Sequence, residues 1–509
     1  MQYFIGLDNG GTITKAALID RNGNEIHTAS IPTKALTPYP GHMERDMDEM
    51  WKANCAVIRS LLQETGVQPS EIAAVGVCGH GKGLYLWGTD DKPVRSGILS
   101  SDNRAYQFSQ KWKADGTEQA VFARSFQHIM ACQPVALLAW LKENEPGVLE
   151  KTKWVFACKD YIRFRLTGEA RAELTDYSGA NLVNLRTKQY DPELLDLFGL
   201  GAILEKLPPL CASTEICGRV TAEASEQCGL SEGMPVIGGM FDIDACALAL
   251  DVVDSSHICM IAGTWSINEY PSPAPILDGS VEMNSLFCLS PYYLVEESSA
   301  TSAGNIEWFV KELLPEVKQE AERQGKSVYD VLNAWVEQIP PEEFVPIFLP
   351  FLMASNIHPN AKGSLIGLMS AHTRRHLVRG VYEGIAFSHR YHLEKLLKTR
   401  STLPESIRLA GGVTRSAVWT QMFADVMQLP IEPVEVREAG ALGCAIAAAV
   451  AVGNHPTLDA AAAAMCKISP RVMPDPSKKQ IYDKKYALYR SVIDCLDPLW
   501  DEMHALVKD

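Results

Sequence analysis

The first residues whose types could bind a ligand or take part in a reaction form a short stretch near the N-terminus. This stretch, Asp-Asn-Gly-Gly-Thr, lies between two apolar runs. Gly10 and Gly11 have no Cβ, so a phosphate group can approach their backbone N–H groups closely. Thr12 can add a hydroxyl donor, and Lys15 a positive charge. Asp8 would repel a bare phosphate, so its carboxylate suits this site only if a divalent cation bridges the two. An ordinary hairpin turn explains the same residues, and both interpretations stay open at this point.

A second group is the acidic segment 238-GGMFDIDACA-247, which follows an apolar run. Asp242 is predicted to lie just past the end of a strand, beside a Gly-Gly loop. A carboxylate there can take the proton of a substrate hydroxyl. Asp244 lies two residues further on and could play the same part. Alternatively, one or both residues cap the helix that follows.

Two further glycine turns occur in the second half of the chain. Gly263 and Thr264 form a Gly-Thr turn that we expect to close a hairpin. Trp265, directly after it, could form the floor of a ligand pocket, but a tryptophan on a buried strand is more often part of the core, which is the position we expect. Gly411 and Gly412 separate an expected strand from an expected helix, where a nucleotide can lie against the backbone. A Gly-Gly pair also closes many ordinary strand–helix turns, so this pair alone predicts little.

The elements that must position these groups follow from the apolar patterns. Alternation and an Asn-Gly turn predict an antiparallel meander at the start, and a 3.6-residue period predicts a long helix after it. Two buried strands are expected next. The expected elements are strands 3–8, 13–20 and 25–32, helix 46–66, and strands 72–79 and 84–88.

The middle of the chain shows a similar pattern of strands joined by glycine turns. Residues 234–250 predict a strand, a Gly-Gly loop and a helix, and residues 257–270 predict a hairpin. We therefore place a domain boundary near residues 251–256. The second half is expected to contain helices at 304–323, 371–397, 439–453 and 478–507, and a strand–glycine–helix unit at 407–428.

Composition limits the classes of function. The chain has 509 residues, enough for two large domains, with 47% hydrophobic and 21% charged residues as in globular proteins. The net charge of −15 argues against nucleic acid or an anionic membrane as a partner. The thirteen cysteines show no disulfide framework and no zinc spacing, which predicts reduced thiols in the cytosol. No signal peptide or membrane span is expected.

The order of these motifs resembles the actin-like, ribonuclease-H-like ATPase superfamily and, within it, the FGGY carbohydrate kinases. The likeness covers nearly the whole chain. It is carried further by 43-MERDMDEMW-51, 98-ILSSDNRA-105, 159-KDYIRFRLTG-168, 381-VYEGIAF-387 and 410-AGGVTRSAVWTQMFADVMQLPI-431. The loop 79-GHGKG-83 and the segment 300-ATSAGNIEWF-309 are similar to those of the bacterial L-xylulose kinase subgroup.

The resemblance implies an α/β fold of two ribonuclease-H-like domains, residues 1–252 and 253–509, with a nucleotide and sugar cleft between them. It implies transfer of the γ-phosphoryl group of ATP, with Mg²⁺, to the terminal hydroxyl of a small sugar, and no nucleic-acid or membrane partner. L-xylulose is the expected sugar; ribulose, D-xylulose, erythritol and glycerol stay open as alternatives. An actin-like ATPase switch without sugar phosphorylation is the alternative of a different class. A homodimer stays open.

The resemblance also assigns roles to single residues. Asp242 matches the general base, and Asp8 matches the acid that organises Mg²⁺. The matching phosphate and nucleotide residues are Gly10, Gly11, Thr12, Lys15, Gly263, Thr264, Gly411, Gly412 and Ser416. The sugar is expected to contact His80, Lys82, Asp102 and Asp242. Three of these have structural alternatives, in which His80 is a packed histidine, Lys82 a solvated charge, and Asp102 the partner of Arg104.

Overall fold

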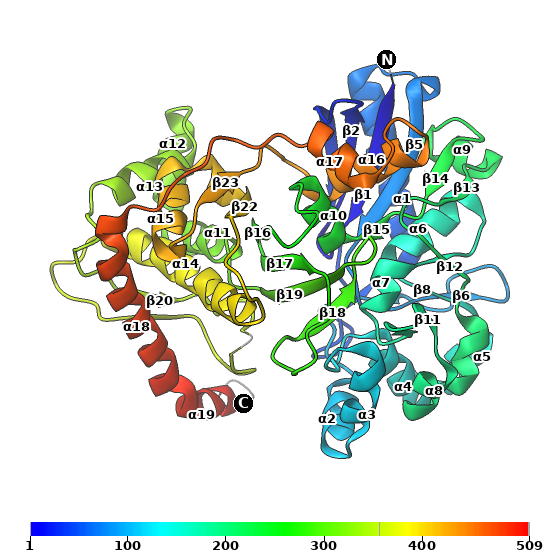
Figure 1. Cartoon of the computed structure of the whole chain (residues 1–509), viewed down its shortest axis with the longest axis horizontal. Helices are drawn as coiled ribbons and strands as arrows, with labels where there is room; N and C mark the ends of the chain where they lie inside the picture. The colour runs from blue at the N-terminus through cyan, green and yellow to red at the C-terminus, as the bar shows by residue number, and fades with distance from the viewer. Residues whose placement is uncertain (1, 356, 507–509) are drawn as a thin grey trace. The chain divides into compact units, whose positions relative to one another are not determined.

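The computed structural model describes residues 2–355 and 357–506, which form two compact units of mixed strands and helices (Figure 1). The first unit runs to Asp254 and regains the chain at Pro271–Val295 and Val436–Lys467. The second unit comprises Ser255–Tyr270, Glu296–Glu435 and the chain from Ile468 onward. Two later segments of the chain therefore belong to the first unit, whereas the sequence division at 252/253 assigned them to the second domain.

The first unit is built on one mixed sheet with the strand order β13-β14-β5-β1-β2-β3. β1 pairs antiparallel with β2 and parallel with β5, and β2 pairs antiparallel with β3, so the predicted meander is confirmed. A short further strand, β15, pairs with β5. The bounds are β1 Tyr3–Asn9, β2 Ile13–Asp20, β3 Glu25–Pro32, β5 Ile72–Gly79, β13 Ile216–Arg219, β14 Pro235–Ile237 and β15 Met240–Phe241.

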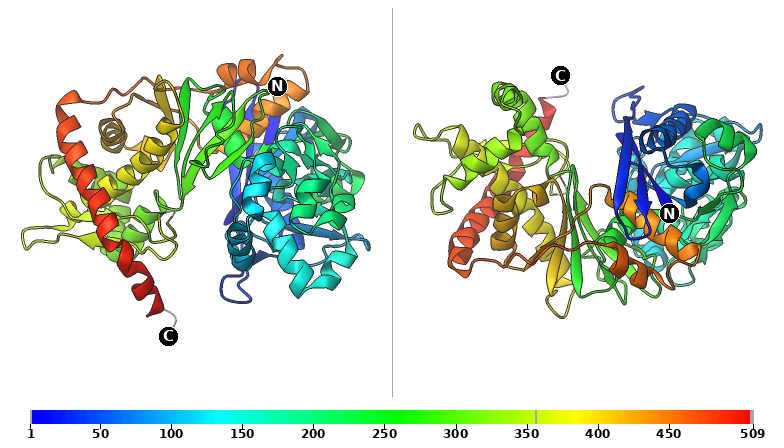
Figure 2. Two further views of the ribbon diagram at one scale, coloured as in Figure 1. Left: turned by 60° about the horizontal axis from the view of Figure 1, so that its bottom comes forward. Right: turned by 90° about the horizontal axis from the view of Figure 1, so that it is seen from above.

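Alternation along β1 directs its side chains to two different helices. Ile5 and Leu7 join a hydrophobic core with α1 (Met47–Thr65), as the period of that segment predicted. Gly6 instead faces α16 (Ala439–Ala451). Figure 2 shows this helix, drawn in orange, packed against the blue strands of the sheet. A Cβ on Gly6 would lie 2.0 Å from the Ala441 carbonyl oxygen, so only glycine permits this approach of helix and sheet.

Smaller elements surround the sheet of the first unit. Its other strands are β4 Glu44–Arg45, β6 Tyr85–Gly88, β7 Gly97–Ile98, β8 Thr152–Phe156, β9 Ala172–Glu173, β10 Val183–Asn184, β11 Gln189–Tyr190, β12 Leu210–Cys211 and β18 Met283–Leu286. Its other helices are α2 Tyr106–Ala114, α3 Thr117–Ser125, α4 Pro134–Asn144, α5 Pro146–Lys151, α6 Cys158–Thr167, α7 Leu174–Ser178, α8 Pro192–Leu197, α9 Ala222–Cys228, α10 Asp242–Ala249 and α17 Leu458–Met465.

The second unit has a sheet whose strands follow the order β19-β17-β16-β22-β23. β16 pairs antiparallel with β17 and parallel with β22. The strands are β16 His257–Ala262, β17 Ser266–Ser272, β19 Tyr293–Ser299, β22 Ser406–Gly411 and β23 Ile431–Pro433, with a separate pair β20 Ile347–Leu349 and β21 Ser364–Ile366. The helices are α11 Gly304–Leu313, α12 Pro315–Arg323, α13 Val328–Glu337, α14 Arg374–Lys398, α15 Ala417–Met427, α18 Lys479–Leu496 and α19 Trp500–Ala505.

Two expected helices are each divided in the structure. The segment 304–323 becomes α11 and α12, because Pro315 has no N–H to continue the first helix and starts the second. The segment 478–507 becomes α18 and α19 around a short 3₁₀ turn at Asp497–Leu499, which contains Pro498. The part of the prediction after residue 506 lies outside the described residues.

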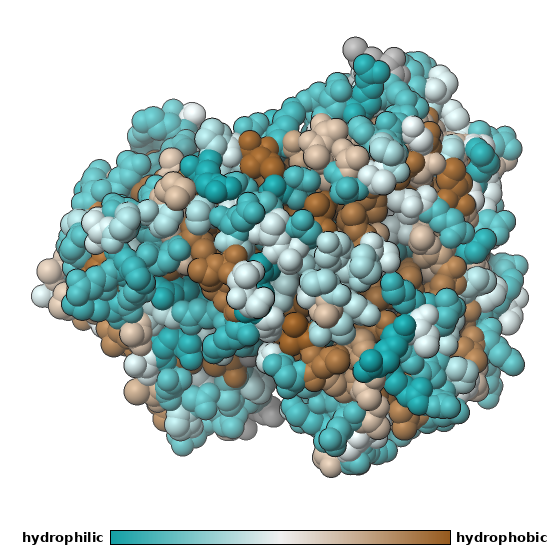
Figure 3. All heavy atoms as spheres, viewed as in Figure 1, coloured by the Kyte–Doolittle hydropathy of each residue, from teal (hydrophilic) through white to brown (hydrophobic). Residues whose placement is uncertain are grey.

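The surface and the thiols agree with the composition. All thirteen cysteines are free thiols, as predicted from their spacing. Hydrophilic side chains dominate the face seen in Figure 3, with apolar residues scattered among them. Within the described residues, every helix is too short or too polar to cross a bilayer.

Candidate active site

Asp8 lies near the end of β1, where the strand meets the first turn of α16. A Cβ on Gly440 would lie 3.1 Å from the Asp8 Oδ2 atom, so the carboxylate faces the N-terminal end of that helix. Burial raises the pKa of Asp8, Lys15 opposes this effect, and Glu438 adds to it. A cation beside Asp8 would therefore stabilise its charged form.

Lys15 on β2 lies opposite Asp8 on β1 in the strand register, and it also forms an ion pair with a second acid. Its Nζ lies 2.7 Å from the Glu438 Oε2 atom, and both side chains are partly buried. Sequence reasoning missed Glu438, because it stands directly before α16 and 423 positions away from Lys15. The structure thus places two carboxylates and one ammonium group beside the first hairpin.

The tip of this hairpin is accessible. Gly10 and Gly11 are partly exposed, and Thr12 is exposed. A Cβ on Gly11 would have no atom within 4 Å, so the space beside this backbone is open. The backbone of the hairpin tip is therefore accessible from solvent.

Asp242 is the first residue of α10 and directly follows β15. Cys78 on β5 is the register partner of both Asp8 on β1 and Met240 on β15, so Asp242 emerges at the same edge of the sheet as Asp8. The backbone N–H of Phe241 donates to the Thr175 Oγ1 atom at 2.9 Å. This bond holds the strand end from which Asp242 projects.

Asp244 has a different environment from Asp242. Asp242 is partly exposed, whereas Asp244 is fully buried and accepts the Cys288 N–H at 2.9 Å. Its Oδ2 atom has no hydrogen-bond partner, and burial and Glu173 raise its pKa well above the usual value. The N-cap residue of α10 is Phe241, so the capping alternative does not describe the position of either aspartate.

The sugar-side candidates His80 and Asp102 make protein contacts. His80 is buried, its Nε2 lies 2.8 Å from the Tyr85 hydroxyl, and burial lowers its pKa to about 4, so the ring is neutral at pH 7. The Arg104 Nε donates to both oxygens of Asp102 at 3.0 Å. These are the contacts that the structural alternatives for His80 and Asp102 predicted.

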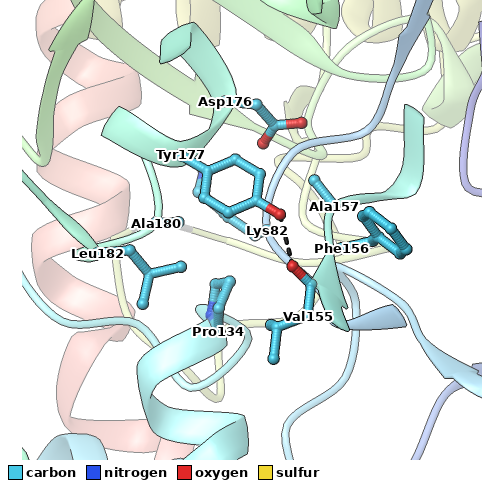
Figure 4. A pocket seen from close by; sticks show the side chains of 9 residues that line it. All are labelled: Lys82, Pro134, Val155, Phe156, Ala157, Asp176, Tyr177, Ala180 and Leu182. Atoms are coloured by element: carbon cyan, nitrogen blue, oxygen red, sulfur yellow. Dashed lines mark hydrogen bonds between the residues drawn. The ribbon is translucent and has the colours of Figure 1, made fainter. Parts of the chain in front are cut away.

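Lys82 lines a small pocket in the first unit (Figure 4). Its backbone has a φ of 63°, in the left-handed region. Tyr177 in the same pocket donates its hydroxyl to the Val155 carbonyl at 2.6 Å. Asp176 is buried beside it, and burial raises its pKa to about 7 although Lys159 opposes this effect. Sequence reasoning did not select Asp176.

The second unit presents its own glycine hairpin between β16 and β17. Gly263 is partly exposed and Thr264 exposed, and the Gly263 carbonyl accepts the Ala303 N–H at 2.7 Å. Trp265 is 50% exposed, so the expected core position is wrong. Its side chain follows the hairpin tip, and the strand becomes buried only from Ser266.

The Gly-Gly turn after β22 needs glycine at its first position. Gly411 has a φ of +101°, and a Cβ there would lie 2.3 Å from the Ala262 carbonyl oxygen. A Cβ on Gly412 would meet nothing within 4 Å. Ser416 accepts the Trp419 N–H at 3.2 Å as the N-cap of α15, and its hydroxyl donates to Asn333 at 2.8 Å. Its hydroxyl therefore has a structural role in this turn.

Comparison with known proteins gives the same family over both halves. Residues 3–249 match the N-terminal domain model of the FGGY family of carbohydrate kinases, and residues 258–452 match its C-terminal domain model. An L-xylulose/3-keto-L-gulonate kinase of Escherichia coli is 36% identical, covering 100% of this chain and 99% of that protein. A probable L-xylulose kinase of Haemophilus influenzae is 35% identical, with coverages of 98% and 100%.

Solved structures agree with this assignment. A ligand-bound xylulose kinase from Lactobacillus acidophilus superposes with a TM-score of 0.88 at 25% identity, covering 99% of this chain and 100% of that one. A glycerol kinase from Plasmodium falciparum, with a TM-score of 0.82 at 18% identity and coverages of 97% and 98%, shares the fold. The sequence motifs, the two glycine hairpins and both domain models lead to one conclusion: the chain belongs to the FGGY family of carbohydrate kinases.

Proposed function

We propose that this kinase transfers the γ-phosphoryl group of ATP to the terminal hydroxyl of L-xylulose and forms L-xylulose 5-phosphate. The observation that carries the sugar assignment is the full-length similarity to kinases named for L-xylulose, at 34–36% identity. The name of the first of these relatives adds 3-keto-L-gulonate, an acidic sugar, as a second acceptor to test.

Asp242 is the proposed general base. It is partly exposed at the start of α10, so it can reach a bound hydroxyl, whereas Asp244 is enclosed. The bond from Phe241 to Thr175 fixes the preceding backbone, and such support limits the motion of a catalytic side chain. Asp242 would take the proton of the terminal hydroxyl as its oxygen attacks the phosphorus.

Each unit carries a glycine hairpin whose backbone N–H groups are proposed donors to phosphate oxygens. In the first unit, the N–H groups of Gly10, Gly11 and Thr12 would bind phosphate oxygens. In the second unit, Gly263 and Thr264 would do the same, with Gly411 and Gly412 beside the adenosine. Phosphoryl transfer needs in-line positioning and charge stabilisation, and exposed backbone donors on rigid hairpins supply both.

The residues around Asp8 fit a magnesium ion that arrives with the nucleotide. Magnesium usually takes one or two carboxylates together with phosphate oxygens and waters. Asp8 is one such carboxylate, and the desolvation that raises its pKa would be offset by a divalent cation. Within the described residues no group of three or more acidic, histidine or cysteine side chains forms a metal cage, in keeping with this mode. Magnesium would supply charge neutralisation at the phosphates.

The test is a coupled ADP-release assay with Mg-ATP on a panel of acceptors: both enantiomers of xylulose and of ribulose, erythritol, glycerol and 3-keto-L-gulonate. The expected result is the highest kcat/KM on L-xylulose, lost in Asp242→Asn. A higher kcat/KM on another acceptor would replace the sugar assignment and leave the base assignment standing. ATP hydrolysis that needs no sugar and survives Asp242→Asn would indicate the ATPase-switch alternative instead.

A further inference from the structure

Arg45 lies on the short strand β4, which pairs antiparallel with β7. Neighbouring side chains on a strand point to opposite faces. Glu44 accordingly contacts Arg104 at 2.8 Å, on the side of the sugar loop. Arg45 reaches the first glycine hairpin, where its Nη2 donates to Thr14 Oγ1 at 2.6 Å and its Nη1 to the Gly10 carbonyl at 3.4 Å.

The charge of Arg45 has no acidic partner. Its side chain is buried, with 3% of the residue exposed, and within the described part of the chain no Asp or Glu oxygen lies within 4 Å of it. Among the residues that the structure describes, the other buried lysines and arginines all have a carboxylate within that distance. They are Arg104, Lys159, Arg163, Arg379 and Arg408.

An unpaired buried charge is unfavourable, because the protein does not replace the lost hydration. A buried charge of this kind is therefore a candidate for binding a ligand of opposite charge. The field of Arg45 is felt at the sugar-side loop, where it helps to lower the pKa of His80. The guanidinium group therefore contacts the phosphate hairpin, and its charge also acts on the loop expected to hold the sugar.

The bond to the Gly10 carbonyl has a geometric consequence. The Gly10–Gly11 peptide is planar and trans in the ordinary case, so its C=O and N–H point in opposite directions. Holding the carbonyl of Gly10 toward Arg45 thus directs the Gly11 N–H away from Arg45. Gly11 is partly exposed, and a Cβ on it would meet no atom within 4 Å, so an anion can approach this part of the hairpin.

We propose that Arg45 is a positioning residue for phosphoryl transfer: it orients the Gly11 N–H through the Gly10 carbonyl and places an uncompensated positive charge beside the phosphate hairpin. The group on which Arg45 acts, through the Gly11 N–H and through its charge, is the γ-phosphoryl group of ATP. The proposal rests on the proposed kinase function, and it adds a cation that has no Asp or Glu oxygen within 4 Å among the described residues. It predicts that Arg45 acts on the nucleotide rather than on the sugar.

The experiment compares wild type with Arg45→Met, which removes the charge, and Arg45→Lys, which keeps it without the planar fork. Arg165→Met is the matched control, because Arg165 is a partly buried arginine of the same unit that contacts Asp48 and the Trp51 ring. Thermal unfolding of each variant is measured first. Then kcat and KM for Mg-ATP and for L-xylulose are measured, together with the Kd for Mg-ATP without sugar.

For Arg45→Met we expect kcat/KM for ATP to fall about 100-fold, the usual effect of losing one preorganised donor, because the Gly11 N–H would no longer be held toward the developing charge. The Kd for Mg-ATP should rise about tenfold, and KM for the sugar should change less than about twofold. Arg45→Lys should recover part of the ATP effect, because charge is restored without the second donor. Arg165→Met should match wild type.

An ATP kcat/KM for Arg45→Met within about threefold of wild type would overturn the proposal, since the charge would then do nothing for phosphoryl transfer. So would a change confined to KM for the sugar, or an equal loss on both substrates that tracks a lower unfolding temperature in both Arg45 variants. If wild type phosphorylates no sugar at all, the proposed function fails, while the Kd for Mg-ATP still decides the role of Arg45.

Discussion

Replacing Asp176 by asparagine should change how the stability of the first unit depends on pH. Asp176 is buried, and its Oδ2 atom lies 3.5 Å from Lys159 Nζ without a hydrogen-bond partner. Burial raises its pKa from 3.8 to about 7, and the neighbouring carboxylates of Asp160 and Glu173 add to the shift. Between pH 3.8 and about 7, the folded chain therefore keeps a proton on Asp176 that the unfolded chain has already released.

The sign and size of the effect follow from proton linkage. Between pH 4 and pH 7 the folded state binds more protons than the unfolded state, so the free energy of unfolding falls as the pH rises. The stabilising contribution is complete below pH 3.8 and is lost as the pH rises through about 7. A shift of about three pKa units corresponds to at most about 4 kcal/mol, and the ion pair with Lys159 reduces that limit.

Asparagine has nearly the same shape as a protonated aspartic acid and does not titrate. We therefore expect Asp176→Asn to have a urea midpoint close to that of wild type near pH 4.5 and a higher midpoint at pH 8. The assay is urea unfolding followed by tryptophan fluorescence at steps from pH 4.5 to pH 8. The transition assigned to the first unit is the one compared.

Asp191→Asn is a control for which the expected change in stability with pH has the opposite sign. Asp191 accepts hydrogen bonds from Arg124 at 2.7 Å and from the Glu193 N–H at 3.0 Å, and its pKa lies below the usual value: burial raises it, but bonds from Asn184 and Arg124 outweigh that effect. Its stabilisation is present above pH 3.8 and is lost as the pH falls through its folded pKa. The free energy of unfolding of this variant should be lower than that of wild type at pH 8, and the difference should disappear at acidic pH.

Parallel pH profiles for Asp176→Asn and wild type would refute the reasoning. Asp176 would then ionise in the folded protein as it does in the unfolded chain, and its burial beside Lys159 would not control its protonation.

Three further outcomes are expected. Gly6→Ala should lower the free energy of unfolding by about 1–3 kcal/mol or more in urea titrations, because its Cβ would collide with the Ala441 carbonyl and force α16 off the sheet. Asp244→Asn should keep kcat within a few-fold of wild type in the ADP-release assay, whereas Asp242→Asn should lose about 10²–10⁴-fold; equal losses would give the two acids a shared role. His389→Leu should lower the free energy of unfolding by about 2–4 kcal/mol in urea titrations, because the buried, neutral ring makes hydrogen bonds to two serine hydroxyls at 2.9 and 3.0 Å and both bonds would be lost; His389→Gln should recover part of this loss.

The sequence alone determined the local parts of this protein. The strand–turn–strand at Asp8, the strand end before Asp242 and the glycine turns at Gly263 and Gly411 all lie where the patterns predicted them. These features depend on short-range rules, namely the two-residue period of strands, the 3.6-residue period of helices and the absence of a Cβ at glycine. They were sufficient for the fold class and for the family.

Only the tertiary structure decided what surrounds those parts. Lys15 meets Glu438 because the chain returns to the first unit more than 400 positions later, and no local pattern encodes such a return. The same holds for Arg45, whose sequence neighbours do not reveal that its charge is buried against the first hairpin without a carboxylate. Desolvation and charge pairing depend on which distant segments pack together, and they decide which acid is buried, which is accessible and which cation is left for a ligand.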